Sequence, residues 1–182
     1  DLTIIDDKAF GKCTALNKLV FSEGLQEIRD SAFSGCTGLQ EVTLTKSLIT
    51  IEKSAFEGCE NLATVKIEAS NISCASSTNI FKGCNISKVV FSDETKVVPS
   101  GLFNGARFYC EYDPNTKEPI RGTGYNLVIP NHIQEVATNA FANSNLMYVT
   151  FEDTKAEPSA LASIGESAFY NCKYLEDVTF PL

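Results

Sequence analysis

Seven cysteines and a single histidine carry the most reactive side chains in this sequence of 182 residues. Five of the cysteines stand three residues after a phenylalanine, at Cys13, Cys36, Cys59, Cys84 and Cys172. Ala106 and Ser144 fill the same place elsewhere, so the position favours a small buried side chain, which cysteine also provides. We therefore predict that these five thiols have a structural role.

Cys74 and Cys110 lie outside this pattern and are the better candidates for a reactive or bridging thiol. An odd total of seven leaves at least one cysteine unpaired. Zinc sites draw on closely spaced cysteine or histidine pairs, whereas this sequence has no Cys-x-x-Cys and only His132. The sequence predicts neither a metal site nor a cofactor.

Motifs for catalysis are also missing from the sequence. His132 is the only histidine base, and it lies in the turn-like sequence Pro-Asn-His-Ile. The run Gly122-Thr123-Gly124 lacks the third glycine of a dinucleotide-binding loop, and no Gly-x-Ser-x-Gly occurs. A hydrolase built on two carboxylates would need acids that converge in one cleft, whereas the acidic pairs here fall in turns. We therefore predict that the protein is not an enzyme.

The charge balance narrows the choice of partner. Fifteen Lys and Arg residues against 23 Asp and Glu residues give a net charge of −8. Nucleic-acid binders need the opposite balance, because neutralising phosphates supplies most of their non-specific affinity. No apolar run approaches the roughly 20 residues needed to cross a bilayer. Neither nucleic-acid binding nor direct membrane insertion of this segment is expected.

A repeated unit organises almost the whole chain. Its phenylalanines stand at Phe10, Phe33, Phe56, Phe81, Phe103, Phe141 and Phe169, with a basic period of about 23 residues. After each unit's small residue come a leucine or isoleucine and then an alternating apolar pair such as Val42 and Leu44, which is typical of a strand with one buried face. One such unit cannot bury its apolar face alone, so about seven stacked units are predicted to form a solenoid.

The segment around each Ala-Phe pair is predicted to be a turn or a short 3₁₀ or α-helix. Good N-cap residues precede four of these pairs, at Ser31, Ser54, Asn139 and Ser167. Such a segment is too short to be a stable helix alone, so its stability has to come from stacking on neighbouring units.

The unit L-x-x-I-x-x-x-A-F-x-x-C-x-x-L-x-x-V-x-F, as in the run Ser31-Ala-Phe-Ser-Gly-Cys36, resembles the BspA-like class of leucine-rich repeat. The resemblance covers residues 1–182 apart from two inserts. It implies a curved solenoid with a parallel β-sheet on the concave face and short turns or helices on the convex face. It also implies secretion or cell-surface display, commonly in bacteria or parasitic protists, with roles in adhesion, host interaction and protein recognition.

Two segments depart from the repeat. Residues 69–79 are small and polar, and are predicted to form a longer solvated loop. Residues 107–126 are predicted to leave the solenoid as a hairpin or ordered loop, and they carry four aromatic residues, Phe108, Tyr109, Tyr112 and Tyr125. These aromatics either contact a partner or pack the insert onto its own solenoid. We expect one domain over residues 1–182, cut from a longer protein.

The remaining candidate for function is the surface of the strands. Side chains that alternate with the buried residues point out of the sheet and vary in charge and size. The candidate binding surface comprises Lys18, Val20, Glu41, Thr43, Thr64, Lys66, Lys88, Val90, Asn126, Tyr148, Thr150, Asp177 and Thr179. We expect a secreted or cell-surface module that binds a protein or glycan through this face. The alternative is a passive spacer or stalk that displays another domain.

Overall fold

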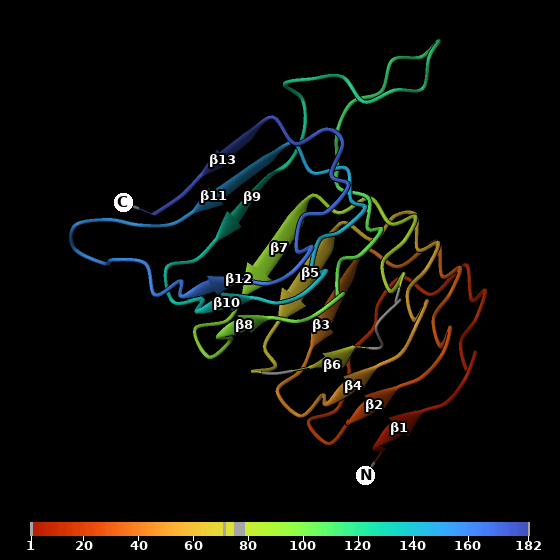
Figure 1. Ribbon diagram of the computed structural model, residues 1–182. Helices are drawn as coiled ribbons and strands as arrows, with labels where there is room; N and C mark the ends of the chain where they lie inside the picture. Colours follow the sequence, from red (N-terminus) through yellow and green to blue (C-terminus); the bar gives the residue numbers. More distant parts are fainter. Residues whose placement is uncertain (1, 71, 75–78, 182) are drawn as a thin grey trace.

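The computed structural model describes residues 2–70, 72–74 and 79–181, and these wind into a β-solenoid (Figure 1). Its strands are of two kinds. The long strands are β3 (Glu41–Leu44), β5 (Thr64–Ile67), β7 (Lys88–Phe91), β9 (Asn126–Ile129), β11 (Tyr148–Phe151) and β13 (Asp177–Thr179). The short strands are β1 (Ile4–Ile5), β2 (Glu27–Ile28), β4 (Thr50–Ile51), β6 (Ser73–Cys74), β8 (Val97–Val98), β10 (Glu135–Val136) and β12 (Ser163–Ile164).

The long strands form two parallel sheets, β3-β5-β7 and β9-β11-β13, where the repeat predicted one continuous sheet. Their register aligns like residues: Val42 lies beside Val65, and Val65 beside Val89. Val42 and Val65 are fully buried, and the residues on either side of them face outward. The predicted alternation is therefore present, but the ladder is interrupted between β7 and β9.

The short strands build a second stack that the sequence did not predict. They form the parallel sheets β1-β2-β4-β6 and β8-β10-β12. Each short strand of the inner turns contributes one buried residue, and Ile28, Ile51, Val98 and Val136 have no exposed surface. Strand β6 lies inside residues 69–79, so the expectation of a solvated loop is wrong for Ser73–Cys74, while residues 71 and 75–78 lie outside the described residues.

The Ala-Phe segments are turns, and no helix occurs in the part of the chain that the structure describes. The predicted N-cap residues instead adopt the left-handed conformation, with φ of 57° at Ser31 and 56° at Asn139. A second left-handed residue follows each inner phenylalanine by two positions, as at Gly35 with φ of 73°. Alternate amides then point to the next turn, so that Phe33 N–H donates to the Ala55 carbonyl at 2.8 Å. A helix would have used those amides within its own segment.

The phenylalanine rings form a continuous column through the core. Neighbouring rings are nearly parallel, and their centroids are 5.2 Å apart for Phe10 and Phe33 and 5.3 Å apart for Phe141 and Phe169. The column also crosses the interruption between the two long-strand sheets, because Phe103 and Phe141 stack at 5.3 Å. Aromatic stacking of this kind adds stability beyond the buried area alone.

Candidate functional site

Three of the five repeat cysteines, Cys36, Cys59 and Cys84, are buried as the sequence predicts, and Cys172 is half-buried. The prediction is wrong for Cys13, which is exposed in the outermost turn. The Cys59 thiol donates to the Phe33 carbonyl at 3.2 Å, and the thiols of Cys36, Cys84 and Cys172 bond in the same way to the phenylalanine of the preceding unit. Burial raises the pKa of Cys59 to about 12. The thiol is therefore protonated at neutral pH and a poor nucleophile.

Cys74 and Cys110, the two candidates for reactive chemistry, are also sheltered. Burial raises the pKa of Cys74 to about 12. Cys110 is buried, and its sulfur accepts a hydrogen bond from the Asn145 amide at 3.4 Å. All seven cysteines, each of which the structure describes, are free thiols. The arrangement therefore offers no exposed thiolate or disulfide at either position.

His132 connects two successive turns of the solenoid through a hydrogen bond. Its Nε2 lies 3.0 Å from the carbonyl oxygen of Ser92, forty residues away in sequence. Within residues 2–70, 72–74 and 79–181, no group of three or more His, Cys, Asp or Glu side chains is arranged to hold a metal ion. Nor does any helix there have the length and apolar character to cross a membrane.

The outer face of β3-β5-β7 carries charged side chains from the predicted surface. Glu41 on β3 and Lys66 on β5 form an ion pair at 2.7 Å. Thr43, Thr64, Lys88 and Val90 lie on the same three strands, at the positions that alternate with the core or at the strand's start. Lys18 and Val20 are exposed but belong to no strand, and Val20 is 78% exposed.

The outer face of β9-β11-β13 has a different chemistry, in which hydroxyl and amide groups make the hydrogen bonds, and Arg121 pairs with Glu176 at 3.8 Å beside it. The Tyr148 hydroxyl donates to the Glu176 carboxylate at 2.8 Å, and Thr150 donates to the Asn126 side-chain oxygen at 3.3 Å. The bond to Glu176 raises the pKa of Tyr148, because it stabilises the protonated phenol. Asp177 and Thr179 lie exposed on the edge strand β13.

Tyr125 fills the interruption between these two faces. Its hydroxyl accepts a hydrogen bond at 3.1 Å from Val89 N–H, on the edge of β7 that faces away from β5. The Tyr125 ring stacks on Phe108, with centroids 5.9 Å apart. Phe108 is fully inside the core, tilted against Phe103 and Phe141. Two of the four aromatic residues proposed for contact therefore pack the insert onto the solenoid.

Asn145 holds the base of the insert, and no pattern in the sequence marks it. Its side-chain oxygen accepts from Phe108 N–H at 2.6 Å, while its amide donates to the Phe108 carbonyl at 2.9 Å. The same amide lies 3.1 Å from the hydroxyl of Tyr112, whose ring also receives the Arg107 guanidinium at 4.5 Å. One half-buried amide thus positions both the insert's backbone and a third aromatic side chain.

The far part of the insert is a small hairpin that projects from the solenoid (Figure 1). Tyr112 and Pro119 form its antiparallel bridge, and the Asp113 carboxylate accepts from the backbone of Asn115 at 2.7 Å and of Thr116 at 2.9 Å. These backbone bonds lower the pKa of Asp113.

The same hairpin is also tied back to the last turn of the solenoid. The Tyr174 hydroxyl donates to the Glu118 carboxylate. Among the four predicted contact aromatics, Tyr109 presents the largest free surface, at 45% exposed, and Ile120 joins it at 38%. The insert therefore offers a partner two exposed apolar side chains, Ile120 on the hairpin and Tyr109 at its base, where Tyr109 N–H donates to the Ile86 carbonyl at 2.7 Å.

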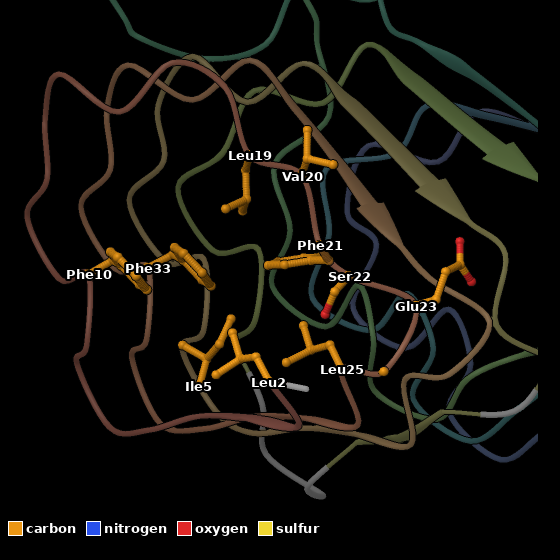
Figure 2. Close-up of a pocket in the computed structure, with 11 residues that line it drawn as sticks. Leu2, Ile5, Phe10, Leu19, Val20, Phe21, Ser22, Glu23, Leu25 and Phe33 are labelled. Atoms are coloured by element: carbon orange, nitrogen blue, oxygen red, sulfur yellow. The ribbon is translucent and has the colours of Figure 1, made fainter.

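Two clefts open at the first turn of the solenoid. Figure 2 shows the apolar one, of about 460 Å³, where Phe10 and Leu2 lie at the mouth and Phe33 lies behind Phe10. The second, of about 490 Å³, separates residues 17–23 from β3 and has a polar lining that includes Glu23 and Glu68.

Comparison with known proteins identifies one family, and the matching solved structures include the two described below. The family described as "BspA type Leucine rich repeat region" matches residues 1–109 and 124–182 in six copies. The predicted count of about seven is therefore not supported, and the segment left unmatched falls within the insert. A search of curated proteins finds no match.

Both solved structures share low identity with this chain. A leucine-rich repeat protein from Bacteroides ovatus is 18% identical, with a TM-score of 0.40, over 97% of this chain and 58% of its own. The pneumococcal vaccine antigen PcpA is 19% identical, with a TM-score of 0.32, over 88% of this chain and 44% of its own. The chain thus spans about half the length of these proteins.

Proposed function

Since the chain belongs to the BspA-type leucine-rich repeat family, we propose that it is a non-catalytic recognition module, secreted or displayed on a cell surface. It binds a protein or glycan through the outer faces of the long strands, with the insert as a second contact. These outward side chains do not take part in packing the core, so they can vary to suit a ligand. The family supplies the expectation of recognition, and the named residues supply the surface.

One observation carries the proposal: the insert is anchored at its base and again at Glu118, and it still presents exposed apolar side chains. Asn145 and Tyr125 hold the base through hydrogen bonds to Phe108 and Val89. Tyr109 and Ile120 stay exposed. A preorganised aromatic group loses little entropy on binding, and tyrosine is favoured in interfaces. A spacer alone would gain nothing from an anchored insert.

A passive spacer is the second candidate, and the ion pairs between successive turns favour it. Arg29 bonds to Asp6 at 3.1 Å, Lys53 to Asp30 at 3.1 Å, and Lys82 to Glu57 at 3.5 Å. Such pairs would stiffen a stalk whether or not a ligand binds. Each exposed pair contributes little by itself, about 0.2–1 kcal/mol.

The test is a binding array of extracellular-matrix proteins, plasma proteins and glycans at physiological salt. Three folded proteins are compared: the unmodified chain, a Lys66→Glu/Tyr148→Ala variant, and a variant with residues 111–120 replaced by a Gly-Ser linker. That replacement leaves Phe108, Tyr125 and Asn145 in place, so the core is kept. A ligand lost in the second protein assigns recognition to the strand faces, and one lost in the third assigns it to the hairpin. No ligand for any of the three rejects recognition in favour of the spacer.

A further inference from the structure

We propose that an extended, basic segment of a partner protein binds as an added strand in the cleft between residues 17–23 and β3. The inference rests on the proposed recognition function and gives it a partner chemistry and a mode of binding. It concerns a cleft that lies away from the insert and beside the charged face of β3-β5-β7.

The cleft replaces a strand pairing that the repeat would lead one to expect. Leu19 and Phe21 pack against the core as their counterparts do in later units. Yet residues 17–23 belong to no strand, and no backbone hydrogen bond within this described part of the chain joins them to residues 40–46. A cleft of about 490 Å³ lies between the two segments instead.

The two turns are closed against each other on both sides of this cleft. On one side, a Cβ placed on Gly38 would lie 2.6 Å from the Thr14 carbonyl oxygen, so the backbones are in direct contact. On the other side, Ser47 Oγ donates to the Leu25 carbonyl at 2.7 Å, and Ile49 N–H to the Gln26 carbonyl at 2.9 Å. The opening is therefore a bounded slot and not the fraying of a whole turn.

The backbone of β3 presents unpaired groups to this slot. Gln40 and Leu44 direct their carbonyls to the β5 side, where Thr64 N–H donates to Gln40 at 3.1 Å and Glu68 N–H to Leu44 at 2.9 Å. In a strand, alternate residues direct their backbone groups to opposite edges. The backbone groups of Glu41 and Thr43 and the N–H of Thr45 therefore face the slot, as an open sheet edge does, while the Thr45 carbonyl accepts from Leu48 N–H at 3.0 Å.

Later turns show which bond is missing. Ser92, the residue after β7, donates its N–H to the carbonyl of Ile67, the last residue of β5, at 2.9 Å. The corresponding bond in the first pair of turns would run from Thr45 N–H to the Phe21 carbonyl, and it is not formed. An extended segment lying parallel to β3 would accept from the N–H groups of β3 and donate to the carbonyls of residues 17–21. Strand addition of this kind supplies affinity through the main chain and specificity through alternate side chains.

The charges along the slot favour a basic segment. Glu23, Glu41 and Glu68 line it, against the single ammonium group of Lys18. Glu41 already pairs with Lys66, which leaves Glu23 and Glu68 as the acids available to a partner. Lys46 lies near both carboxylates but is already paired with Glu94 at 2.9 Å, and that pair is the main cause of the raised pKa of Lys46. Complementary charge there would steer the segment and fix its register.

Three fluorescent octapeptides test the proposal by anisotropy on the folded chain: Val-Lys-Val-Lys-Val-Lys-Val-Lys, its counterpart with glutamate in place of lysine, and the lysine peptide N-methylated at alternate residues. The lysine peptide is expected to bind, with affinity at least tenfold lower in Glu23→Lys/Glu68→Lys. A matched variant, Glu152→Lys/Glu166→Lys, has the same net charge with both changes in distant turns, and is expected to bind within twofold of the unmodified chain. N-methylation should abolish binding, because it removes backbone donors and keeps the charge.

Amide hydrogen exchange supplies the second measurement. The amides of Glu41, Thr43 and Thr45 are expected to exchange rapidly in the free chain and to slow when the lysine peptide binds. Slow exchange of Thr43 without peptide would show the slot to be closed and overturn the proposal. Equal loss of binding in both double variants, or undiminished binding of the N-methylated peptide, would reduce the effect to charge alone and also overturn it. Preference for the glutamate peptide would reject the basic partner.

The proposed function fails separately from this inference. If array ligands bind while the lysine peptide does not, recognition stands and the added strand is rejected. If the lysine peptide binds as described and no array ligand depends on the strand faces or the hairpin, the slot stands without the wider surface.

Discussion

The two long-strand sheets are built from the same repeat but differ in how they meet their neighbours. In β3-β5-β7 the ladder runs without interruption, and Glu41 pairs with Lys66 across its outer face. In β9-β11-β13 the ladder begins after an insert, and its outer face is joined by neutral donors such as Tyr148 and Thr150. A shared core therefore does not impose a shared surface.

At the interruption between the two sheets the strand pairing is broken, whereas the aromatic stacking in the core continues. On the strand side, the Tyr125 hydroxyl takes the Val89 amide that a neighbouring strand would have bonded. On the turn side, Phe103 and Phe141 stack at 5.3 Å although 38 residues separate them. The solenoid thus accepts an insertion where one side chain can satisfy an open edge and where the aromatic column remains continuous.

The largest expected effect comes from breaking the column at the point where it crosses the interruption. Phe103→Ala removes a fully buried ring that contacts Phe81, Phe108 and Phe141, and should lower the free energy of unfolding by about 3–5 kcal/mol. Phe10→Ala, at a ring that is 44% exposed, should cost clearly less. Urea unfolding followed by circular dichroism measures both. Two separate transitions in Phe103→Ala would show that the column couples the two sheets, whereas a loss no larger than that of Phe10→Ala would contradict the importance of this crossing point.

The next effect concerns the base of the insert. Asn145→Ala leaves the Phe108 amide and carbonyl without their side-chain partner, at a cost of about 1–3 kcal/mol for the unsatisfied groups. The insert should also become more sensitive to trypsin at Lys117 and Arg121. Asn115→Ala, at the exposed end of the hairpin, is the control and should change neither property. Unaltered proteolysis of Asn145→Ala would mean that other contacts fix the insert.

The sequence predicts the solenoid core well, because its columns repeat. The phenylalanines of the inner turns, the small residue at Cys36 and Cys59, and the alternating Val42 and Leu44 all occupy the expected buried positions, whereas Phe10 in the outermost turn is exposed. It does not predict the short strands, because a two-residue strand leaves only one buried residue per turn and no alternation to detect. Serine is also ambiguous, since the residue type that caps a helix at Ser31 equally tolerates the left-handed turn found there.

The candidate site is less predictable than the core, because it depends on departures from the repeat. Alternation in the insert does not say which face is inward, so Phe108 and Tyr109 look alike in sequence although one is buried and the other exposed. Asn145 occupies the place that Thr37 and Glu60 fill in other units, and only the tertiary structure brings it to the insert. A repeat thus predicts what is common to its copies, and the partners of an insert are specific to one of them.

A smaller effect tests the hydrogen bond between Tyr125 and Val89, which covers the edge of β7 between the two sheets. Tyr125→Phe keeps the ring on Phe108 and removes the hydroxyl that receives Val89 N–H, for an expected cost of about 1 kcal/mol. Exchange of the Val89 amide should accelerate. Tyr109→Phe makes the same chemical change at an exposed position and should leave that amide unaffected. Should the Val89 amide exchange at its original rate in Tyr125→Phe, the hydroxyl is not what protects the edge of β7.

The smallest effect separates the chemistry of the two outer faces. Lys66→Gln removes an exposed ion pair, and the loss of up to about 1 kcal/mol should shrink as salt screens the charges. Tyr148→Phe removes a hydrogen bond to Glu176, whose signature is a dependence on pH.

Because that bond raises the pKa of Tyr148 above its usual value of 10.0, the folded chain holds the phenolic proton more tightly than the unfolded chain. The stabilisation is then complete below pH 10 and declines as pH rises through the higher folded value. The free energy of unfolding of both variants and of the unmodified chain is measured by urea unfolding from pH 7 to 11 and at two salt concentrations. Groups that titrate alike in all three proteins cancel when each variant is compared with the unmodified chain at the same pH. A Tyr148→Phe difference that stays constant over this range would mean that Glu176 does not hold the phenol, and the contrast between the two faces would then rest on the ion pair alone.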